Sequence, residues 1–266
     1  MVESAAKPFI STDDLQALMQ GGEPLRILDC SIVMDGSSDP HLSFSMEHID
    51  GARFFDHHFA KDQSASYPFM MPGREHFVKM AKALDVRKSY TVVCYDCQKG
   101  WFANRAAFMF RAYGHTNVRV LDGGFPKWKA DGKAVVADAQ VAAADDFDYQ
   151  FDAECVKSYE QVKAITEDKS AQIIDNRGAG GFAQGSIPTS ISVPQPTLVN
   201  EDGTFKNSDE LKATFEAAGV DLAQPMVFTC GGGIMATVGK IAADQAGATG
   251  HRSVFDGSWA EWSANQ

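Results

Sequence analysis

The stretch Leu121-Asp122-Gly123-Gly124 has a close counterpart in Phe255-Asp256-Gly257-Ser258. Trp128 is matched by Trp262 at the same offset of 134 residues (122 to 256, and 128 to 262). Self-similarity at a long, fixed offset indicates a duplicated structural unit. We therefore expect two halves of about equal size, each near the usual size of a domain.

Short apolar runs alternate with helical patterns, which is typical of α/β folds with a parallel sheet. The predicted strands are Arg26–Asp29, Thr91–Tyr95, Val118–Leu121, Gln172–Asp175, Met226–Thr229 and Ser253–Phe255.

Helix starts and a linker complete this outline. N-cap signatures predict helices that begin at Ser11-Thr12-Asp13-Asp14 and at Ser208-Asp209-Glu210. Residues 131–148 are rich in Ala and Asp and have no clear periodicity, so we interpret them as the linker. The predicted boundary lies near residue 145, which gives domains of residues 1–145 and 146–266.

Composition excludes several classes of protein. Of the 266 residues, 44% are hydrophobic and 22% are charged, which are ordinary globular values. The formal net charge of -11 argues against general binding to nucleic acids or to anionic membranes. No apolar run approaches the roughly 20 residues of a membrane-spanning helix. The first residues carry Glu3 and Lys7 and lack the apolar core of a secretory signal.

The five cysteines are Cys30, Cys94, Cys97, Cys155 and Cys230. An odd and sparse set in a chain of this length does not indicate a disulfide framework, so we expect a reducing compartment, the cytoplasm. Cys94 and Cys97 form a C-x-x-C pair, but a zinc site would need two more ligands at suitable spacing. Because Cys94 lies within a predicted apolar strand, a redox motif is also disfavoured. We expect no metal and no bound cofactor.

The two halves differ after one pair of equivalent strands. The offset of 134 places Tyr95-Asp96 on Thr229-Cys230, so one half carries an aspartate where the other carries a cysteine. Cys230 is followed by Gly231-Gly232-Gly233 and then by a helical pattern that starts at Ile234. Ligands of open α/β sheets bind just beyond such strand ends.

This pattern favours a reactive cysteine. Three glycines allow successive N–H groups to point inward, and the following helix adds the positive end of its dipole. Cysteines in such surroundings can have a pKa between about 3.5 and 7.5, against about 8.5 for the free thiol. Cys230 would then be a nucleophile that needs neither metal nor cofactor, and the same amides would stabilise a persulfide anion on it. A buried structural cysteine before a glycine turn is the alternative.

Other loops of similar appearance fit less well. A phosphate-binding loop needs Lys-Ser or Lys-Thr after the glycines, where this chain has Ile234-Met235. A dinucleotide-binding loop needs spaced glycines and gives a cysteine no role. A cysteine phosphatase needs an arginine where Ala236 stands.

An ordered set of short motifs extends over nearly the whole chain. They are Ile27-Leu28-Asp29, His48-Ile49-Asp50-Gly51-Ala52, Phe54-Phe55-Asp56, Met71-Pro72-Gly73, Phe110-Arg111-Ala112-Tyr113-Gly114-His115, Leu121-Asp122-Gly123-Gly124, Ile174-Asp175-Asn176-Arg177, Cys230-Gly231-Gly232-Gly233 and Asp256-Gly257-Ser258-Trp259. With these motifs the chain resembles the tandem rhodanese sulfurtransferases, and most closely the 3-mercaptopyruvate type, with the thiosulfate type as a near relative.

The resemblance implies two tandem rhodanese-like domains, each a mostly parallel sheet flanked by helices. The first would be catalytically silent, with Asp96 in place of cysteine. In the second, Cys230 would take a sulfane sulfur from mercaptopyruvate or thiosulfate as a persulfide and pass it to a thiol, thioredoxin or cyanide. The loop without a basic pair, Gly231 to Met235, favours mercaptopyruvate.

The resemblance also assigns substrate-binding residues. These are Arg177, for the carboxylate or sulfonate of the donor, and the loop residues Gly231, Gly232, Gly233, Ile234 and Met235. Trp101 and Phe102 would line the pocket, with core packing as an equal alternative. Mitochondrial import occurs in this family, but Glu3 and the lack of an early arginine argue against it.

The chain departs from the family pattern at several positions. The serine and threonine of the family loop are Gly232 and Met235 here. The relatives' aspartate and histidine from the first domain correspond to His58 and Phe69. The pair His57-His58 could supply an imidazole instead, with a solvated pair of loop histidines as the alternative. The stretch that holds the relatives' second basic residue is shortened to residues 178–186. These departures keep open the alternative of a weakly active or non-catalytic module that carries sulfur or binds a partner.

Overall fold

The computed structural model describes residues 7–32, 39–137 and 149–266. The chain divides into two compact units. Unit 1 comprises Met1–Ala60, Pro72–Phe151 and Asp202–Thr204, and unit 2 comprises Lys61–Met71, Asp152–Glu201 and Phe205–Gln266. The predicted boundary near residue 145 lies outside the described residues, so the division into 1–145 and 146–266 stays a prediction.

The elements of unit 1 alternate between strand and helix in the predicted manner. They are β1 (Phe9–Ile10), α1 (Thr12–Gly21), β2 (Leu25–Asp29), α2 (Pro40–Met46), β3 (Ala52–Phe54), α3 (His57–Ala60), α4 (Arg74–Ala83), β4 (Thr91–Tyr95), α5 (Trp101–Ala112), β5 (Val118–Leu121) and α6 (Gly124–Ala130).

Unit 2 repeats the scheme. Its elements are the 3-10 helix η1 (Ala153–Cys155), β6 (Val156–Lys157), α7 (Tyr159–Asp168), β7 (Gln172–Asp175), α8 (Ala179–Ala183), β8 (Ile191–Ser192), the 3-10 helix η2 (Gln195–Leu198), α9 (Ser208–Ala217), β9 (Met226–Thr229), α10 (Met235–Gln245), β10 (Arg252–Phe255) and α11 (Ser258–Ala264).

Both sheets have five strands in the same order. The order is β1-β5-β4-β2-β3 in unit 1 and β6-β10-β9-β7-β8 in unit 2, and every strand pair is parallel. All six predicted strands are present, and two of them start one residue earlier, at Leu25 and Arg252. The predicted α/β fold of two tandem parallel sheets is therefore confirmed.

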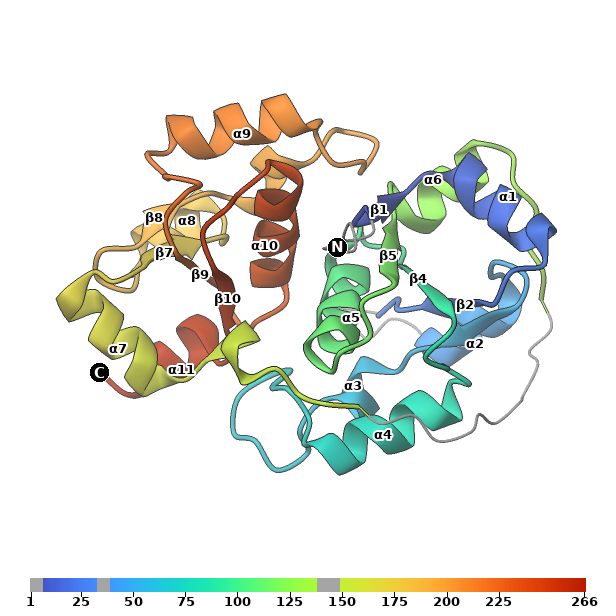
Figure 1. Ribbon diagram of the computed structural model, residues 1–266, viewed down its shortest axis with the longest axis horizontal. Helices are drawn as coiled ribbons and strands as arrows, with labels where there is room; N and C mark the ends of the chain where they lie inside the picture. Colours follow the sequence, from blue (N-terminus) through green and yellow to red (C-terminus); the bar gives the residue numbers. More distant parts are fainter. Residues whose placement is uncertain (1–6, 33–38, 138–148) are drawn as a thin grey trace, which may run out of the picture. The chain divides into compact units, whose positions relative to one another are not determined.

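Helices cover both faces of each sheet (Figure 1). In unit 1 the core on one face joins α1 and α6, through Leu15 and Trp128, to β2, β4 and β5. In unit 2 the equivalent core joins α7 and α11, through Val162 and Trp262, to β7, β9 and β10. Helices α5 and α10 pack on the opposite faces. The repeated tryptophans are thus explained as core residues at equivalent places.

Helix starts follow the expected chemistry with one shift. Ser11 is the N-cap of α1, and its Oγ accepts the N–H of Asp14 at 3.1 Å. The second helix, α9, begins at Ser208 as predicted, but its N-cap is Asn207 rather than Ser208. Asn207 and Glu210 exchange side-chain and backbone hydrogen bonds at 3.0 Å each, a capping box that the serine would not complete.

No helix among the described residues is both long enough and apolar enough to cross a bilayer.

Candidate active site

Cys230 stands directly after β9, whose four residues are all buried, and before α10. The chain must turn sharply between these elements, and it does so at Gly233, with a φ of 86°. That value favours glycine over any residue with a Cβ atom. A Cβ atom at Gly231 would meet open space, whereas one at Gly232 would lie 3.4 Å from Cβ of Pro68. Of the three glycines, Gly233 is therefore the one that the turn requires.

The sulfur of Cys230 accepts a backbone hydrogen bond. The N–H of Gly233 donates to Sγ at 3.2 Å, and the cysteine is 2% exposed. Helix α10 begins at Met235, and no side chain caps its N-terminus. A backbone N–H and the positive end of a helix dipole both stabilise negative charge. The predicted loop Gly231 to Met235 is thus arranged to hold an anionic sulfur.

The start of α11 clamps this loop through the backbone. Trp259 N–H donates to the carbonyl of Cys230 at 2.9 Å, and Ala260 N–H donates to the carbonyl of Gly231 at 3.0 Å. The Oγ atom of Ser258 accepts the N–H of Cys230 at 3.2 Å. Both peptide groups that flank the cysteine are therefore held by the same helix.

Arg177 lies at the end of β7 and is already engaged. Its Nε and Nη2 atoms donate to the buried carboxylate of Asp175 at 2.7 to 3.1 Å, and Nη2 also donates to the carbonyl of Gly185 at 2.7 Å. Its guanidinium lies 4.5 Å from the ring centroid of Trp259. No acceptor among the described residues bonds its Nη1 atom. That group is available for the carboxylate that the resemblance assigns to Arg177.

Sequence reasoning missed a segment that borders the loop. Lys61–Met71 comes from the first half of the chain but belongs to unit 2. Met71 N–H donates to Oδ2 of Asp256 at 2.6 Å, and Asn265 Nδ2 donates to Tyr67 Oη at 3.0 Å. Pro68 lies beside Gly232. The signal that could have found this segment was the expectation, drawn from the resemblance, that Phe69 stands where the family has a histidine from the first domain.

The equivalent loop of unit 1 holds Asp96 after β4. Its Oδ1 atom accepts the N–H groups of Gln98 and Gly100 at 2.7 and 2.8 Å, and Oδ2 accepts those of Phe102 and Ala103 at 2.8 Å each. Burial raises the pKa of Asp96, and these four bonds act in the opposite direction. The backbone N–H groups of Gln98, Gly100, Phe102 and Ala103 therefore form an anion-binding site, which we call the anion cup. The carboxylate of Asp96 occupies it.

The other candidate residues of the first half lie within unit 1. His57 is 3% exposed and packs against Phe55 and Phe102, with ring centroids 4.8 and 5.3 Å apart. Burial lowers its pKa to about 3. Its neighbour His58 is exposed, Phe102 is buried and Trp101 is partly buried. His57 and Phe102 are thus core residues of unit 1.

The cysteines provide no second site. All five are free; Cys94 is buried in β4, and Cys97 is exposed. Although part of the Cys97 residue is exposed, desolvation by the protein around its thiol raises the pKa of that thiol to about 11. Among the described residues, no group of three or more His, Cys, Asp or Glu side chains could hold a metal ion.

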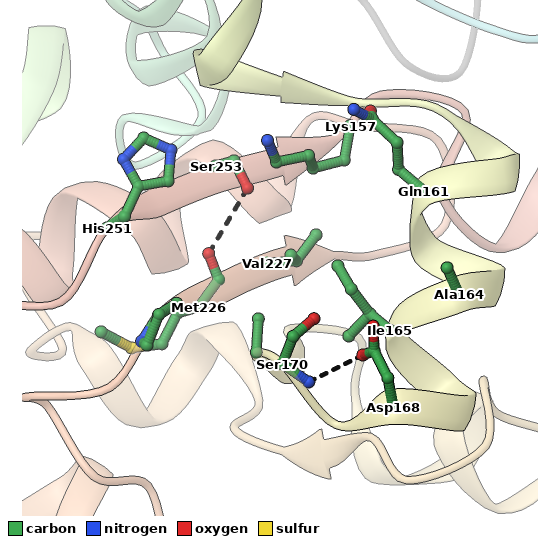
Figure 2. Close-up of a pocket in the computed structure, with 12 residues that line it drawn as sticks. Lys157, Gln161, Ala164, Ile165, Asp168, Ser170, Met226, Val227, His251 and Ser253 are labelled. Atoms are coloured by element: carbon green, nitrogen blue, oxygen red, sulfur yellow. Dashed lines mark hydrogen bonds between the residues drawn. The ribbon is translucent and has the colours of Figure 1, made fainter.

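A pocket of about 410 Å³ lies at the other end of the unit 2 sheet (Figure 2). It is formed between α7 and the first residues of β9 and β10, whereas Cys230 follows the last residue of β9. The apolar side chains of Ile165 and Val227 lie between Lys157 at one end and Asp168 at the other. Lys157 pairs with Glu154 at 2.9 Å. This pocket is separate from the cysteine.

Comparison with known proteins agrees with this geometry. The family model of the rhodanese-like domain matches residues 11–131 and 158–265. The chain is 35% identical to a thiosulfate sulfurtransferase of Gallus gallus over 252 residues, covering 91% of this chain and 87% of that protein. It is 33% identical to a 3-mercaptopyruvate sulfurtransferase of Homo sapiens over 257 residues, covering 91% and 86%.

A solved structure shows the same architecture. SseA from Escherichia coli, described as a 3-mercaptopyruvate sulfotransferase, superposes with a TM-score of 0.88 at 29% identity, covering 96% of this chain and 99% of its own. The two matched segments, the two identical strand orders and the cysteine loop after β9 agree with one another. The chain therefore belongs to the rhodanese family and carries two copies of the rhodanese-like domain in tandem.

Proposed function

We propose that this protein is a sulfurtransferase that moves a sulfane sulfur from a small donor, through a persulfide on Cys230, to a thiol acceptor. The observation that carries the proposal is the Cys230 sulfur itself, which accepts the Gly233 N–H beside the uncapped start of α10. Relatives at 33 to 35% identity over most of the chain are thiosulfate and 3-mercaptopyruvate sulfurtransferases. The enzymatic interpretation is therefore favoured over a passive module.

The first half-reaction loads the cysteine. The Cys230 thiolate attacks the thiol sulfur of 3-mercaptopyruvate or the outer sulfur of thiosulfate and forms an S–S bond. With 3-mercaptopyruvate the C–S bond breaks, its electron pair stays on the carbon, and the thiol proton moves there to give pyruvate. With thiosulfate the S–S bond of the donor breaks and sulfite leaves with the electron pair. The Gly233 N–H and the start of α10 stabilise the anionic sulfur before and after this transfer.

The second half-reaction unloads the cysteine. An acceptor thiolate, the thiolate of a thioredoxin or cyanide attacks the outer sulfur of the persulfide. The S–S bond breaks, and the electron pair returns to Sγ of Cys230. Covalent catalysis of this kind divides one difficult transfer into two easier steps. The class of acceptor is part of the proposal.

The surroundings of Cys230 favour 3-mercaptopyruvate over thiosulfate. The loop Gly231-Gly232 adds no basic side chain, and Arg177 has already committed Nε and Nη2 to Asp175. The remaining Nη1 group suits one carboxylate better than a compact dianion. We expect kcat/KM for mercaptopyruvate to exceed that for thiosulfate, and Arg177→Lys to lower the mercaptopyruvate value mainly through KM.

Intact mass after exposure to each donor tests the function. Sulfur uptake should add about 32 Da, as in other cysteine persulfides. Cyanide should remove the increment, and Cys230→Ser should abolish it. Cys97→Ser is the matched control, because Cys97 is exposed yet lies in unit 1. Absence of cyanide-removable sulfur with both donors, or an increment that persists in Cys230→Ser, would overturn the proposal.

A non-catalytic sulfur carrier is the second candidate. It is favoured by Gly232 and Met235, which leave the loop without the hydroxyl groups of the family pattern. This alternative predicts a single sulfur uptake without sustained turnover, and a partner that still binds Cys230→Ser. Repeated turnover with mercaptopyruvate and a simple thiol acceptor would exclude it.

We place the protein in the cytoplasm. The support is chemical, since all five cysteines are free and the proposed reaction needs a reduced Cys230. Fractionation of cells with an antibody against the protein tests this location, and recovery in mitochondria would contradict it.

A further inference from the structure

Ser258 has a backbone conformation that is unusual for a serine. It begins α11, its exposed fraction is 0%, and its φ is 51°. Residues with a Cβ atom seldom adopt this left-handed region, and they persist there when other interactions hold them. The position therefore calls for an explanation from its contacts.

The other half of the molecule shows what the backbone alone requires. Gly124 occupies the equivalent position, 134 residues earlier, with a φ of 60°. A Cβ atom there would lie 2.5 Å from the carbonyl oxygen of Asp96. Both positions therefore have a left-handed φ, although the preceding residue differs, with a φ of 79° at Gly123 and of -70° at Gly257. The backbone conformation favours glycine in both units, so the serine must contribute through its hydroxyl group.

The hydroxyl of Ser258 has a definite orientation. It donates its proton to the carbonyl of Phe255 at 2.8 Å, which turns its lone pairs toward the N–H of Cys230 at 3.2 Å. The next residue, Trp259, donates its N–H to the carbonyl of Cys230 at 2.9 Å. The two peptide groups around Cys230 are therefore fixed, and with them the direction of the Cα–Cβ bond that carries the sulfur.

The two loops explain why unit 2 needs this contact and unit 1 does not. In unit 1 the Phe125 N–H still donates to the Asp96 carbonyl at 2.9 Å, but the Asp96 carboxylate also bonds four loop amides and so orders the loop itself. A sulfur atom is a weak acceptor and cannot order a loop in this way. The cysteine loop therefore needs hydrogen bonds from residues outside the loop, which Ser258 and Trp259 supply.

We propose that Ser258 is a positioning residue for sulfur transfer. Its hydroxyl holds the N–H of Cys230 so that Sγ stays 3.2 Å from the Gly233 N–H in the thiolate and in the persulfide. Ser258 neither gives nor takes a proton in the reaction, since its hydroxyl proton is bonded to the Phe255 carbonyl. The inference rests on the proposed function, which makes Cys230 the sulfur carrier.

Two variants separate the hydroxyl from the strained backbone. Ser258→Ala removes the hydroxyl and keeps the Cβ atom, whereas Ser258→Gly removes the hydroxyl and suits the positive φ. We expect both to lower the single-turnover rate of persulfide formation by about 10- to 100-fold, as small misplacements of reacting groups do. KM for the donor should change less than about twofold, because Ser258 is fully buried and a donor in solvent cannot reach it. Ser258→Gly should unfold at the same urea concentration as the wild type or a higher one.

A matched control comes from the same sheet. Ser253 lies in β10 and is 1% exposed. Its hydroxyl donates to the carbonyl of Met226 at 3.5 Å. Met226 is the first residue of β9, whereas Cys230 follows the last residue of that strand. Ser253→Ala should leave sulfur uptake unchanged. Wild-type uptake in Ser258→Gly, or a loss in Ser253→Ala as large as in Ser258→Ala, would overturn the inference.

A second readout does not depend on sulfur transfer. The rate at which iodoacetamide, an uncharged reagent, alkylates Cys230 should fall in Ser258→Gly and Ser258→Ala, with Cys97→Ser as the common background. If the wild type takes up no sulfur, the proposed function fails, and the alkylation rates still decide the role of Ser258. Equal rates in wild type and Ser258→Gly would overturn it.

Discussion

The loops after β4 and β9 occupy the same place in two sheets of the same strand order. Residues 96–100 and 230–234 connect equivalent strands to equivalent helices. In unit 1 the loop amides bond a carboxylate that belongs to the loop, and in unit 2 one amide bonds a cysteine sulfur. The difference predicts that unit 1 does not transfer sulfur, because its own carboxylate already occupies the anion cup.

This difference predicts opposite roles for the two side chains. Asp96 should stabilise the fold of unit 1, because three buried N–H groups and one partly buried N–H group donate to it. Cys230 contributes little to folding, because the described residues supply its sulfur with one backbone donor, Gly233. The comparison can therefore be tested by stability as well as by activity.

The largest effect is expected at Asp96. Asp96→Ala leaves three buried N–H groups and one partly buried N–H group without their acceptor, and we expect it to lower the free energy of unfolding by about 4 kcal/mol. Cys230→Ala should lower it by about 1 kcal/mol. Urea denaturation measures both. Asp96→Asn keeps one acceptor oxygen and should give an intermediate loss. Equal losses of unfolding free energy at Asp96 and Cys230 would contradict the view that Asp96 is a structural residue and Cys230 a functional one.

Acid provides a second way to separate the two units. His57 is buried in unit 1, whereas the single histidine of unit 2, His251, is exposed. Burial, assisted by the charges of Arg105 and His58, lowers the pKa of His57 to about 3 from 6.5. The unfolded chain therefore binds a proton at higher pH than the folded one does. As the pH falls from 6.5 toward 3, this group destabilises unit 1.

The expected slope approaches about 1.4 kcal/mol of unfolding free energy per pH unit in that window. His57→Gln should flatten the slope, since glutamine does not titrate, and His58→Gln at the exposed neighbour is the control. Urea denaturation at pH 7, 6, 5 and 4 measures the effect. A slope that is the same in wild type and His57→Gln would show that the imidazole is not held neutral.

The central strands could be predicted because they are continuous apolar runs. Val92 to Tyr95 and Met226 to Thr229 are buried on both faces, so their sequence carries a strong signal. The outer strands β1, β3, β6 and β8 have only two or three residues each and too few apolar positions to form a pattern. They are specified by pairing with their neighbours, which a single sequence does not show.

The site was partly predictable for a similar reason. Cys230 and its glycines are consecutive, so the local sequence describes them. Arg177 was assigned from resemblance alone, and its bonds to Asp175 and Gly185 depend on how a loop folds back. The approach of Pro68 to Gly232 depends on a segment that leaves its own half of the chain, and no local pattern encodes such a contact.

An intermediate loss of unfolding free energy is expected at Gly124, because the turn of unit 1 leaves no room for a Cβ atom there. Gly124→Ala would place a Cβ atom 2.5 Å from the carbonyl oxygen of Asp96 at a φ of 60°. We expect a loss of about 2 to 3 kcal/mol from steric overlap and backbone strain together. Gly22→Ala is the control, because its φ is 70° and nothing lies within 4 Å of a Cβ atom there. It should cost about 1 kcal/mol from the backbone alone.

Urea denaturation again provides the measurement. Equal losses at Gly124 and Gly22 would show that the turn of unit 1 relaxes to the geometry that Ser258 adopts in unit 2. The choice between glycine and serine would then not distinguish the two loops.

The smallest effect is expected within the cysteine loop itself. Gly233 has a φ of 86°, and Lys99, 134 residues earlier, has a φ of 58°. An L-residue fits the second value better than the first, so Gly233→Ala should cost about 1 to 2 kcal/mol and also displace the N–H that donates to Sγ. Gly231→Ala meets open space and should change stability by less than about 0.5 kcal/mol.

These two variants separate the shape of the loop from its mere flexibility. If the Gly233 N–H holds the sulfur, Gly233→Ala should slow persulfide formation measured by intact mass, while Gly231→Ala should retain most of the wild-type rate. If flexibility alone mattered, both substitutions would slow it equally, because each removes one glycine from the same loop. Equal rates in the two variants would therefore contradict the assignment of Gly233 as the amide that stabilises the sulfur anion.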